Sequence, residues 1–283
     1  MDTKSNITFC ISTWNNLDYL KIAVDSVRRN SHFKDSPFII HAENCTDGTD
    51  EWLVENEKKY NLSVYIDKND IPIGIGGGMN FCAEKAETEY ILFLHSDFYV
   101  TKDWDLHLYN LRDKFDWVDS FRFEPNIFNQ QLGFRHGTII LPVDSFGTLH
   151  NDFNEIRFDR YVDEFQKINE AEILYPKLQG VSGLIKKETW NAVGGNDPLF
   201  APASWEDMDL YLRFRNMGYN YTSTSKSIIW HFGARGSHRL EENEGKSSER
   251  QIKAETRNKV KWIEKWKKPP VFDQYGMISG LMG

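Results

Sequence analysis

The chain has 283 residues, of which 40% are hydrophobic and 27% are charged, and its formal net charge is −8. This composition is typical of a globular protein and excludes a disordered or fibrous chain. The acidic balance argues against a dedicated nucleic-acid-binding protein, because such proteins present a basic surface to phosphate. Three cysteines without a C-x-x-C pair argue against a disulfide framework and a structural zinc site.

The sequence indicates a cytoplasmic protein. The first residues lack a long apolar region of the kind that a secretory signal needs. No stretch reaches the roughly 18 consecutive apolar residues of a membrane-spanning helix.

Apolar runs alternate with helical patterns over the first 95 residues. Runs rich in β-branched and aromatic residues predict strands at 7–12, 37–41, 62–66 and 90–94. Apolar residues at helical spacing predict helices at 17–27, 52–60 and 79–86, the last opened by a glycine-rich loop at 74–78. This order predicts an α/β fold with a mostly parallel central sheet and helices on both faces.

Residues 103–178 mix aromatic and charged side chains and give weaker signals. They contain a candidate strand at 138–143 and a charged stretch, 152–172, that fits a helix or a lid. Further along, helices are predicted from Lys187 and from 205–209 to Gly218, followed by a strand at 227–230. A polar loop and a helix are expected at 238–259, and an irregular tail at 269–283.

Three polar side chains follow predicted strands directly. These are Asn15, Glu43 and Asp97, and parallel sheets bind their ligands at the carboxyl ends of the strands. We therefore expect them to converge on one crevice. Asp97 offers a hard oxygen ligand that suits Mg²⁺ or Mn²⁺ on a diphosphate, and the alternative is an aspartate that caps the next turn.

Carboxylates crowd at one predicted helix start, at Glu206, Asp207 and Asp209. The helix dipole favours acidic residues there, which is the purely structural explanation. Crowded carboxylates also favour a shared proton or a cation, and one that faces a cleft can act as a general base. His231, at the end of the last strand, can complete a metal site, with Arg235 in the next loop for phosphate; a core or surface histidine is the alternative.

Other nucleotide and hydrolase signatures are missing. The glycine run 74–78 is separated from the preceding strand by Asp70-Ile71-Pro72, so it is a weak dinucleotide fingerprint and a better close-approach loop. The chain has no G-x-x-x-x-G-K-[ST] loop and no G-x-S-x-G elbow. A P-loop ATPase and an α/β-hydrolase are therefore disfavoured.

Six segments, in order over residues 5–237, resemble the family-2 glycosyltransferases of the GT-A fold. They are ISTWN at 11–15, ENCTDGT at 43–49, NDIPIGIGGGMN at 69–80, HSD at 95–97, EDMDL at 206–210, and His231 with the loop after it. The HSD segment falls where the family has its D-x-D metal motif, and EDMDL is similar to its acceptor motif.

The resemblance implies an inverting transfer of a sugar from a nucleotide-activated donor, with UDP favoured and Mn²⁺ or Mg²⁺ as the cofactor. It implies that Asp207 is the base and that Asp97 and His231 bind the metal. The implied donor-binding residues are Thr13, Asn15, Glu43, Asn80, His95, Ser96 and Arg235. The implied acceptor-binding residues are Trp205, Glu206 and Gly183.

The resemblance also implies a division of the chain. Residues 1–237 are expected to form the catalytic domain, with a donor half at about 1–100 and an acceptor half at about 101–237. Residues 238–283 are expected to form a mobile loop, a C-terminal helix and a tail. We further expect residues 233–250 to act as a lid that a donor orders.

Two departures from the family pattern leave questions open. His95 replaces the first acid of D-x-D, and Ala42 replaces one of the paired acids at Glu43. The resemblance leaves the acceptor open among a glycan, a lipid-linked glycan and another hydroxyl compound, and the negative charge disfavours a nucleic acid. The alternatives are a non-catalytic sugar- or nucleotide-binding protein, which His95 favours, and a nucleotidyltransferase, which lacks its glycine signature here.

The run 259–268 is basic and aromatic. It fits either a segment that lies on a membrane surface or an amphipathic helix that packs Trp262 and Trp266 on the domain. We favour the packed helix, and a peripheral membrane location remains the alternative.

Overall fold

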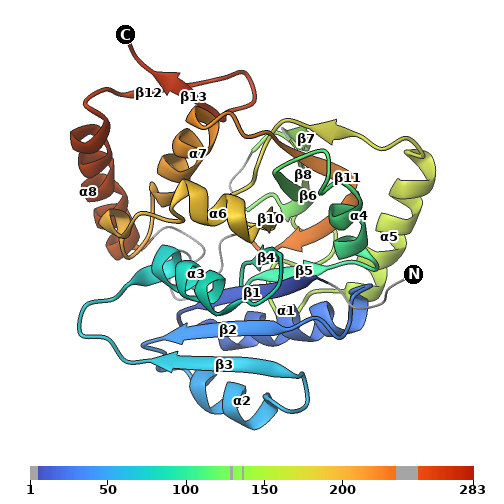
Figure 1. Cartoon of the computed structure of the whole chain (residues 1–283). Coiled ribbons are helices and arrows are strands. Elements are labelled where there is room, and N and C mark those ends of the chain that lie inside the picture. The colour runs from blue at the N-terminus through green and yellow to red at the C-terminus, as the bar shows by residue number, and fades with distance from the viewer. Residues whose placement is uncertain (1–5, 128–129, 136, 234–247) are drawn as a thin grey trace.

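The computed structural model describes residues 6–127, 130–135, 137–233 and 248–283. Its main sheet contains β1 (Ile7–Thr13), β2 (Phe38–Glu43), β3 (Leu62–Asp67), β4 (Tyr90–Leu94), β5 (Phe98–Val100), β6 (Trp117–Pro125), β7 (Gly133–Arg135), β8 (Thr138–Leu141), β9 (Leu174–Tyr175), β10 (Gly183–Lys186) and β11 (Tyr221–His231). The strand order is β3-β2-β1-β4-β10-β6-β11-β5, with β8 on β6, β7 on β8 and β9 on β11 (Figure 1).

Helices connect and cover these strands. They are α1 (Leu17–Asn30), α2 (Thr49–Asn56), α3 (Gly74–Lys85), α4 (Trp104–Asn110), α5 (Glu155–Ile168), α6 (Lys187–Val193), the short 3₁₀ helix η1 (Pro198–Phe200), α7 (Glu206–Asn216) and α8 (Glu249–Trp266). A hairpin of β12 (Pro270–Phe272) and β13 (Ile278–Leu281) ends the chain.

The direction of the strands gathers several carboxyl ends at one edge. β3, β2, β1 and β4 pair in parallel, and so do β6 and β11. Because β10 is antiparallel to both β4 and β6, those two strands also run the same way. The ends of β1, β2, β4, β6 and β11 therefore meet at the same edge, where such sheets bind ligands. The predicted α/β fold with a mostly parallel sheet is confirmed.

Helices cover both faces of the sheet, as the sequence predicted. On β1, Ile7, Phe9 and Ile11 join a core with side chains of α1, α2 and α4. The intervening Cys10 faces the other side, where α3, α6, α7 and α8 form a second core. A third, largely aromatic core lies between β6, β11 and α5. All of β1 is buried, with successive side chains on opposite faces, as a sheet covered on both faces requires.

The glycine run is the first part of a helix rather than a loop, which corrects the predicted start at residue 79. α3 begins at Gly74 because packing outweighs the low helix propensity of glycine. A Cβ on Gly78 would overlap Ser12 Oγ on β1, and Gly74 has a φ of 69° against the backbone of Pro202. The glycines let the helix lie directly on the end of the sheet.

The C-terminal region also differs in part from the prediction. Residues 269–283 form the β12–β13 hairpin, not an irregular tail, and Met277 and Ile278 are buried in the second core. The preferred packing of the last helix is confirmed: Trp262 is fully buried, and Trp266 Nε1 donates to Asp209 Oδ1 at 2.8 Å. The predicted lid falls largely on 234–247, which lies outside the described residues.

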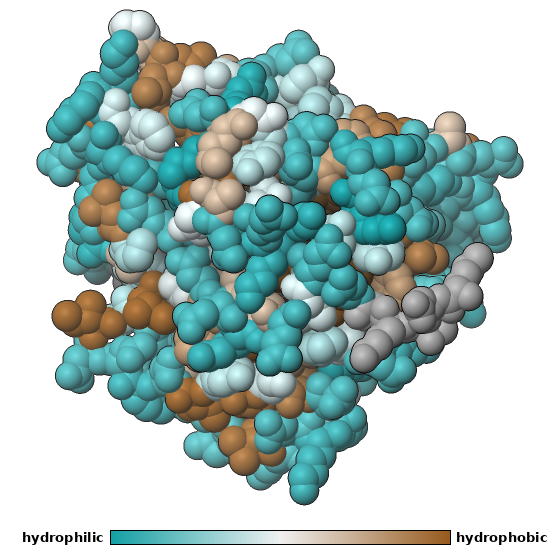
Figure 2. Space-filling model, in the orientation of Figure 1, coloured by the Kyte–Doolittle hydropathy of each residue, from teal (hydrophilic) through white to brown (hydrophobic). Residues whose placement is uncertain are grey.

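The face of the molecule that is seen in the orientation of Figure 1 exposes little apolar area. Figure 2 shows a mainly hydrophilic face with small, separated hydrophobic groups. Within the part of the chain that the structure describes, no helix has the length and apolar character needed to cross a bilayer.

Candidate active site

A cavity of about 490 Å³ opens at the carboxyl edge of the sheet. This volume is in the range of small-molecule binding sites. The ends of β1, β2, β4 and β11 contribute to its wall, together with the loop before α7, the start of α7, one turn of α8 and the hairpin. Of the predicted site residues, those that line it are Thr13, Glu43, His95, Ser96, Asp97, Trp205, Glu206, Asp207 and His231.

Asp97 and His231 face each other in this cavity. The Oδ2 atom of Asp97 lies 3.4 Å from His231 Nε2, and both side chains are buried. Among the described residues, Asp97 Oδ2 makes no hydrogen bond of good geometry. On the other side of the ring, His231 Nδ1 lies 2.6 Å from Glu124 Oε1.

These buried groups shift one another's pKa values. Burial opposes the charge on His231, but Asp97 and Glu124 outweigh it and raise the pKa of His231 to about 9. Burial likewise opposes ionisation of Asp97 and Glu124, and the histidine cation nevertheless lowers the pKa of each carboxyl group. The site therefore favours a positive charge between two carboxylates.

The donor set fits a hard divalent cation. A carboxylate oxygen without a good partner next to an imidazole nitrogen is a suitable ligand pair, and a carboxylate on the other ring nitrogen is the usual support. In the described part of the chain, no three His, Cys, Asp or Glu side chains converge as a complete metal cage. A cation held by Asp97 and His231 would therefore need further ligands from a bound substrate or water.

His95 occupies the position next to this pair without adding negative charge. Its ring stacks on Phe98 at 4.8 Å between centroids, and its Nε2 lies 3.2 Å from the carbonyl of Val181. Burial, with the nearby Arg122, lowers the pKa of His95 to about 3. The residue that replaces the first acid of D-x-D is thus a neutral side chain at neutral pH.

Glu206 and Asp207 form the acidic part of the cavity. Among the described residues, the buried Oε2 of Glu206 has no hydrogen-bond partner, whereas Asp207 Oδ1 accepts from the Met208 amide at 2.8 Å. Burial and the adjacent Asp207 raise the pKa of Glu206 to about 8. Burial also raises the pKa of Asp207, and Arg122 opposes that rise. The Glu206 carboxyl group therefore favours its protonated form at neutral pH.

Asp209, in contrast, has two cationic neighbours. It is fully buried and accepts from Arg213 Nε at 2.8 Å, and it lies 2.6 Å from Lys265 Nζ. Asp209 therefore holds α7 to α8 and is not among the residues that line the cavity.

On the donor side, Glu43 lines the cavity but its carboxylate is already engaged. It accepts from Asn69 Nδ2 and the Ile73 amide through Oε1, and from the Gly74 amide through Oε2, at 2.7–2.8 Å. Glu43 therefore fixes the start of α3. Thr13 Oγ1 donates to the Asn15 carbonyl, and Ser96 Oγ accepts from the side-chain Nδ2 of Asn16.

Three predicted residues lie outside the cavity lining. Asn15 Oδ1 accepts from the Thr46 amide at 2.7 Å and shapes that turn. Asn80 exchanges two hydrogen bonds with the Asn196 backbone. Gly183 has a φ of 92° in β10, where a Cβ would overlap the Val118 carbonyl. Arg235 belongs to the residues that the structure does not describe.

Sequence reasoning missed Arg122 and Glu124, both on β6. Arg122 is 6% exposed, lines the cavity and donates from Nη2 to Ser182 Oγ at 2.9 Å; among the described residues its Nε has no partner. The available signal was the polar alternation in the aromatic segment WVDSFRFEP, because charged residues inside a buried strand need a specific reason. Gln251 and Glu255 of α8 also line the cavity and were not singled out.

The raised pKa of Glu206 predicts how stability depends on pH. Its pKa rises from 4.5 in the unfolded chain to about 8, so the folded state binds more protons between those values. Stability therefore falls as the pH rises through this window. We expect Glu206→Gln to remove part of this loss, so that its Tm advantage over the parent grows between pH 5 and pH 8.

Thermal unfolding at several pH values tests this, with Glu164→Gln on the exposed side of α5 as the control. A difference between Glu206→Gln and the parent that stays constant across the range would contradict the assignment.

Known proteins share this sequence pattern and fold. The family model for glycosyl transferase family 2 matches residues 8–166. An uncharacterised protein of Mycobacterium tuberculosis is 38% identical over 60 residues, which is 20% of this chain and 23% of that protein. A protein of Mycobacterium bovis, also uncharacterised, gives the same values. These matches span less than a quarter of either curated relative.

Solved structures match a larger share of the chain than the curated sequences do. S. aureus TarS covers 84% of this chain and 41% of its own, with 14% identity and a TM-score of 0.52. TarS 1–349 with UDP-GlcNAc covers 79% and 57%, with 16% identity and a TM-score of 0.52. GalNAc-T7 with UDP, GalNAc and Mn²⁺ covers 95% and 48%, with 16% identity and a TM-score of 0.62.

At these identities the structural likeness establishes the fold, which is of the GT-A type. The family model covers more than half of the chain. On this basis, the chain belongs to glycosyl transferase family 2.

Proposed function

We propose that this protein is a metal-dependent, inverting glycosyltransferase that transfers a sugar from a UDP-linked donor to an acceptor hydroxyl. One observation carries the proposal: a single cavity contains both the Asp97–His231 pair and the buried Glu206–Asp207 pair. The first pair suits a cation on a diphosphate, and the second suits removal of a proton. Membership of the glycosyltransferase family supports this combination.

The donor class is proposed from chemistry and from the fold neighbours. TarS has been solved with UDP-GlcNAc, and GalNAc-T7 with UDP, GalNAc and Mn²⁺. Thr13, Glu43, His95 and Ser96 line the same cavity, at the ends of the strands where a nucleoside would lie. We also propose that residues 1–100, approximately, bind the donor and that residues 101–237, approximately, bind the acceptor.

Asp97 and His231 would hold Mn²⁺ or Mg²⁺, and Glu124 would orient the His231 ring. The bound cation would neutralise charge on the diphosphate leaving group. Arg122 lines the cavity and adds a buried positive charge that favours an anionic ligand. Charges held in place before the reaction stabilise developing charge efficiently in a water-poor site.

Asp207 is the proposed general base. It takes the proton of the acceptor hydroxyl as that oxygen bonds to the anomeric carbon, while the bond from that carbon to the diphosphate oxygen breaks. A single displacement of this kind inverts the anomeric configuration and needs only one catalytic carboxylate. The pKa of Glu206, raised by burial to about 8, keeps that carboxyl group protonated at neutral pH, so it adds no second negative charge beside Asp207.

Trp205, Glu206, Glu255 and Phe272 also line the cavity and are the proposed contacts of the acceptor. Aromatic faces and carboxylates suit a hydroxyl-rich acceptor. A glycan or a lipid-linked glycan is therefore proposed ahead of a nucleic acid. A cytoplasmic location is proposed with it.

The proposal predicts slow donor hydrolysis, with water in place of the acceptor. UDP-α-glucose, UDP-α-GlcNAc, UDP-α-galactose and UDP-α-GalNAc form the panel, each with Mn²⁺ or with EDTA. We expect one of them to be hydrolysed only with Mn²⁺, and proton NMR to detect the β-anomer first. First release of the α-anomer would refute inversion, and equal turnover in EDTA would refute metal dependence.

A second prediction concerns Glu124. Because carboxylates that support a metal-bound histidine typically contribute 10–100-fold in affinity, we expect Glu124→Gln to raise the Kd for Mn²⁺ by about 10-fold or more. Calorimetric titration of Mn²⁺ in the presence of UDP measures this. Glu255→Gln, which removes another carboxylate from the same cavity, is the matched control. An unchanged Kd in Glu124→Gln would show that Glu124 has no part in metal binding.

A further inference from the structure

The segment before α7 has an unusual backbone. Ser204 and Trp205 have φ values of 78° and 74°, in the left-handed region that non-glycine residues seldom adopt. Such conformations are strained and persist only where the surroundings impose them. Because Glu206 and Asp207 follow directly, this conformation determines where their carboxylates point.

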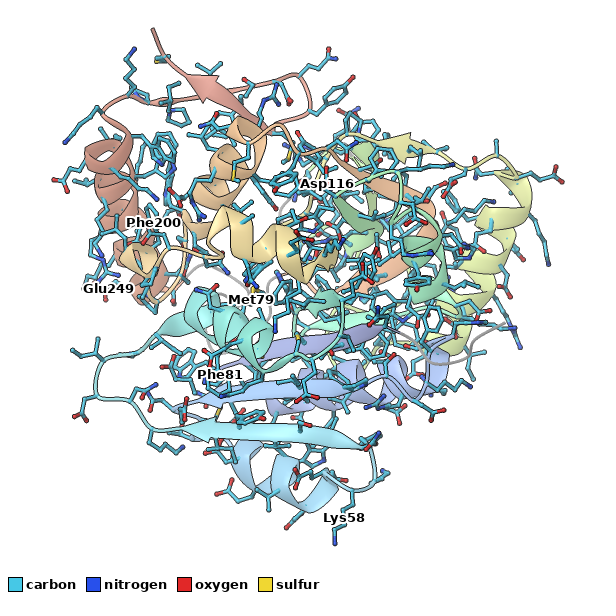
Figure 3. The ribbon with its side chains drawn as sticks, viewed as in Figure 1. Lys58, Met79, Phe81, Asp116, Phe200 and Glu249 are labelled. Carbon is cyan, nitrogen blue, oxygen red and sulfur yellow. The ribbon has the colours of Figure 1, made fainter. Side chains whose placement is uncertain are left out.

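The constraint comes from Asn258 on α8. This side chain is fully buried, and its Nδ2 donates to the carbonyls of Phe200, Ala203 and Ser204 at 2.6, 2.8 and 3.0 Å. One amide thus gathers three carbonyl oxygens of the segment 200–204. Figure 3 shows Phe200 beside α8, with Glu249 at the start of that helix.

Neighbouring α8 residues add contacts to the same segment. Gln251 Nε2 donates to Ser204 Oγ at 2.6 Å, and Arg257 Nη2 donates to the Ala201 carbonyl at 2.8 Å. The Trp262 ring packs against Trp205 with 5.7 Å between centroids. These contacts recur along one side of the helix, so α8 contacts the segment 200–205 at several residues.

α8 also holds the helix that carries the carboxylates. Lys265 Nζ lies 2.6 Å from Asp209 Oδ1, and Trp266 Nε1 donates to the same oxygen at 2.8 Å. Asp209 is two residues beyond Asp207 on α7. The Glu206–Asp207 pair is therefore fixed from both sides by the same helix, which lies outside the residues matched by the family model.

We propose that Asn258 is a positioning residue that sets the orientation of the Glu206–Asp207 pair by holding the backbone of 200–205. This inference rests on the proposed function. It adds that the C-terminal helix α8 shapes the catalytic site. The metal pair, in contrast, is held at the ends of β4 and β11 and by Glu124. Changes at Asn258 should therefore affect proton removal much more than nucleotide or metal binding.

Three variants and a control test this. Asn258→Asp keeps the shape but removes the donor, Asn258→Ala removes the side chain, and Gln251→Ala removes a contact from a part-exposed position. Thr256→Ala on the same helix is the control, because Thr256 is exposed and bonds only within α8 in the described structure. Circular dichroism and Tm identify any variant that does not fold, and Gln251→Ala carries the test if both Asn258 variants fail.

For the UDP-sugar that the parent turns over, we expect the Asn258 variants to lose at least tenfold in kcat. The Kd for UDP with Mn²⁺ should stay within twofold of the parent, Gln251→Ala should lose less, and Thr256→Ala should match the parent. An unchanged kcat in folded Asn258 and Gln251 variants would overturn the proposal. So would an equal loss of kcat and UDP affinity, because a general structural role predicts that result.

Hydrogen exchange gives a readout that does not depend on activity. Amides of 200–207 should exchange at least tenfold faster in Asn258→Asp than in Thr256→Ala, while those of β1 and β4 should not change. If the parent turns over no UDP-sugar, the proposed function fails, and the exchange result still decides the role of Asn258. Unchanged exchange at 200–207 would refute that role.

Discussion

The chain of buried charges from Glu124 through His231 to Asp97 is the constraint on which the cavity depends. Each group comes from a different part of the sheet, on β6, at the end of β11 and just after β4. Buried charges are costly unless each has a partner, so the histidine between two carboxylates favours close approach of these three segments. The same arrangement leaves Asp97 and His231 lining the cavity, where the proposed cation would take the place of the positive charge on His231.

A second set of charges is arranged differently. Among the residues that the structure describes, no cation lies as close to Glu206 or Asp207 as Lys265 and Arg213 lie to Asp209, and burial raises the pKa values of both carboxyl groups. Arg122 lines the cavity and lowers the pKa of Asp207. The site thus separates one pair suited to a cation from another suited to a proton, and α8 supports the second pair from outside the sheet (Figure 1).

Local patterns predicted the first half of the fold well, because β1 to β4 are apolar runs bounded by polar turns. They also singled out Asp97, His231, Glu206 and Asp207, which line the cavity, since each stands at a strand end or a helix start. The rest depends on tertiary contacts. α3 begins at Gly74 because glycines fit against Ser12 and Pro202, which spacing along the chain does not reveal. Arg122, Glu124 and Asn258 are polar residues inside a strand or a helix, and only the packing of distant segments explains them. The roles of the site residues stay predictions.

The most direct test of the account is Asp207→Asn, measured for both donor binding and turnover. General bases typically contribute 10²–10⁴-fold. We therefore predict that Asp207→Asn binds UDP with Mn²⁺ as the parent does and loses UDP-sugar turnover by about 10²–10⁴-fold. Turnover equal to that of the parent would contradict the assignment of Asp207 as the base. Turnover and UDP binding lost together, in a folded variant, would contradict the separation of the two charged pairs.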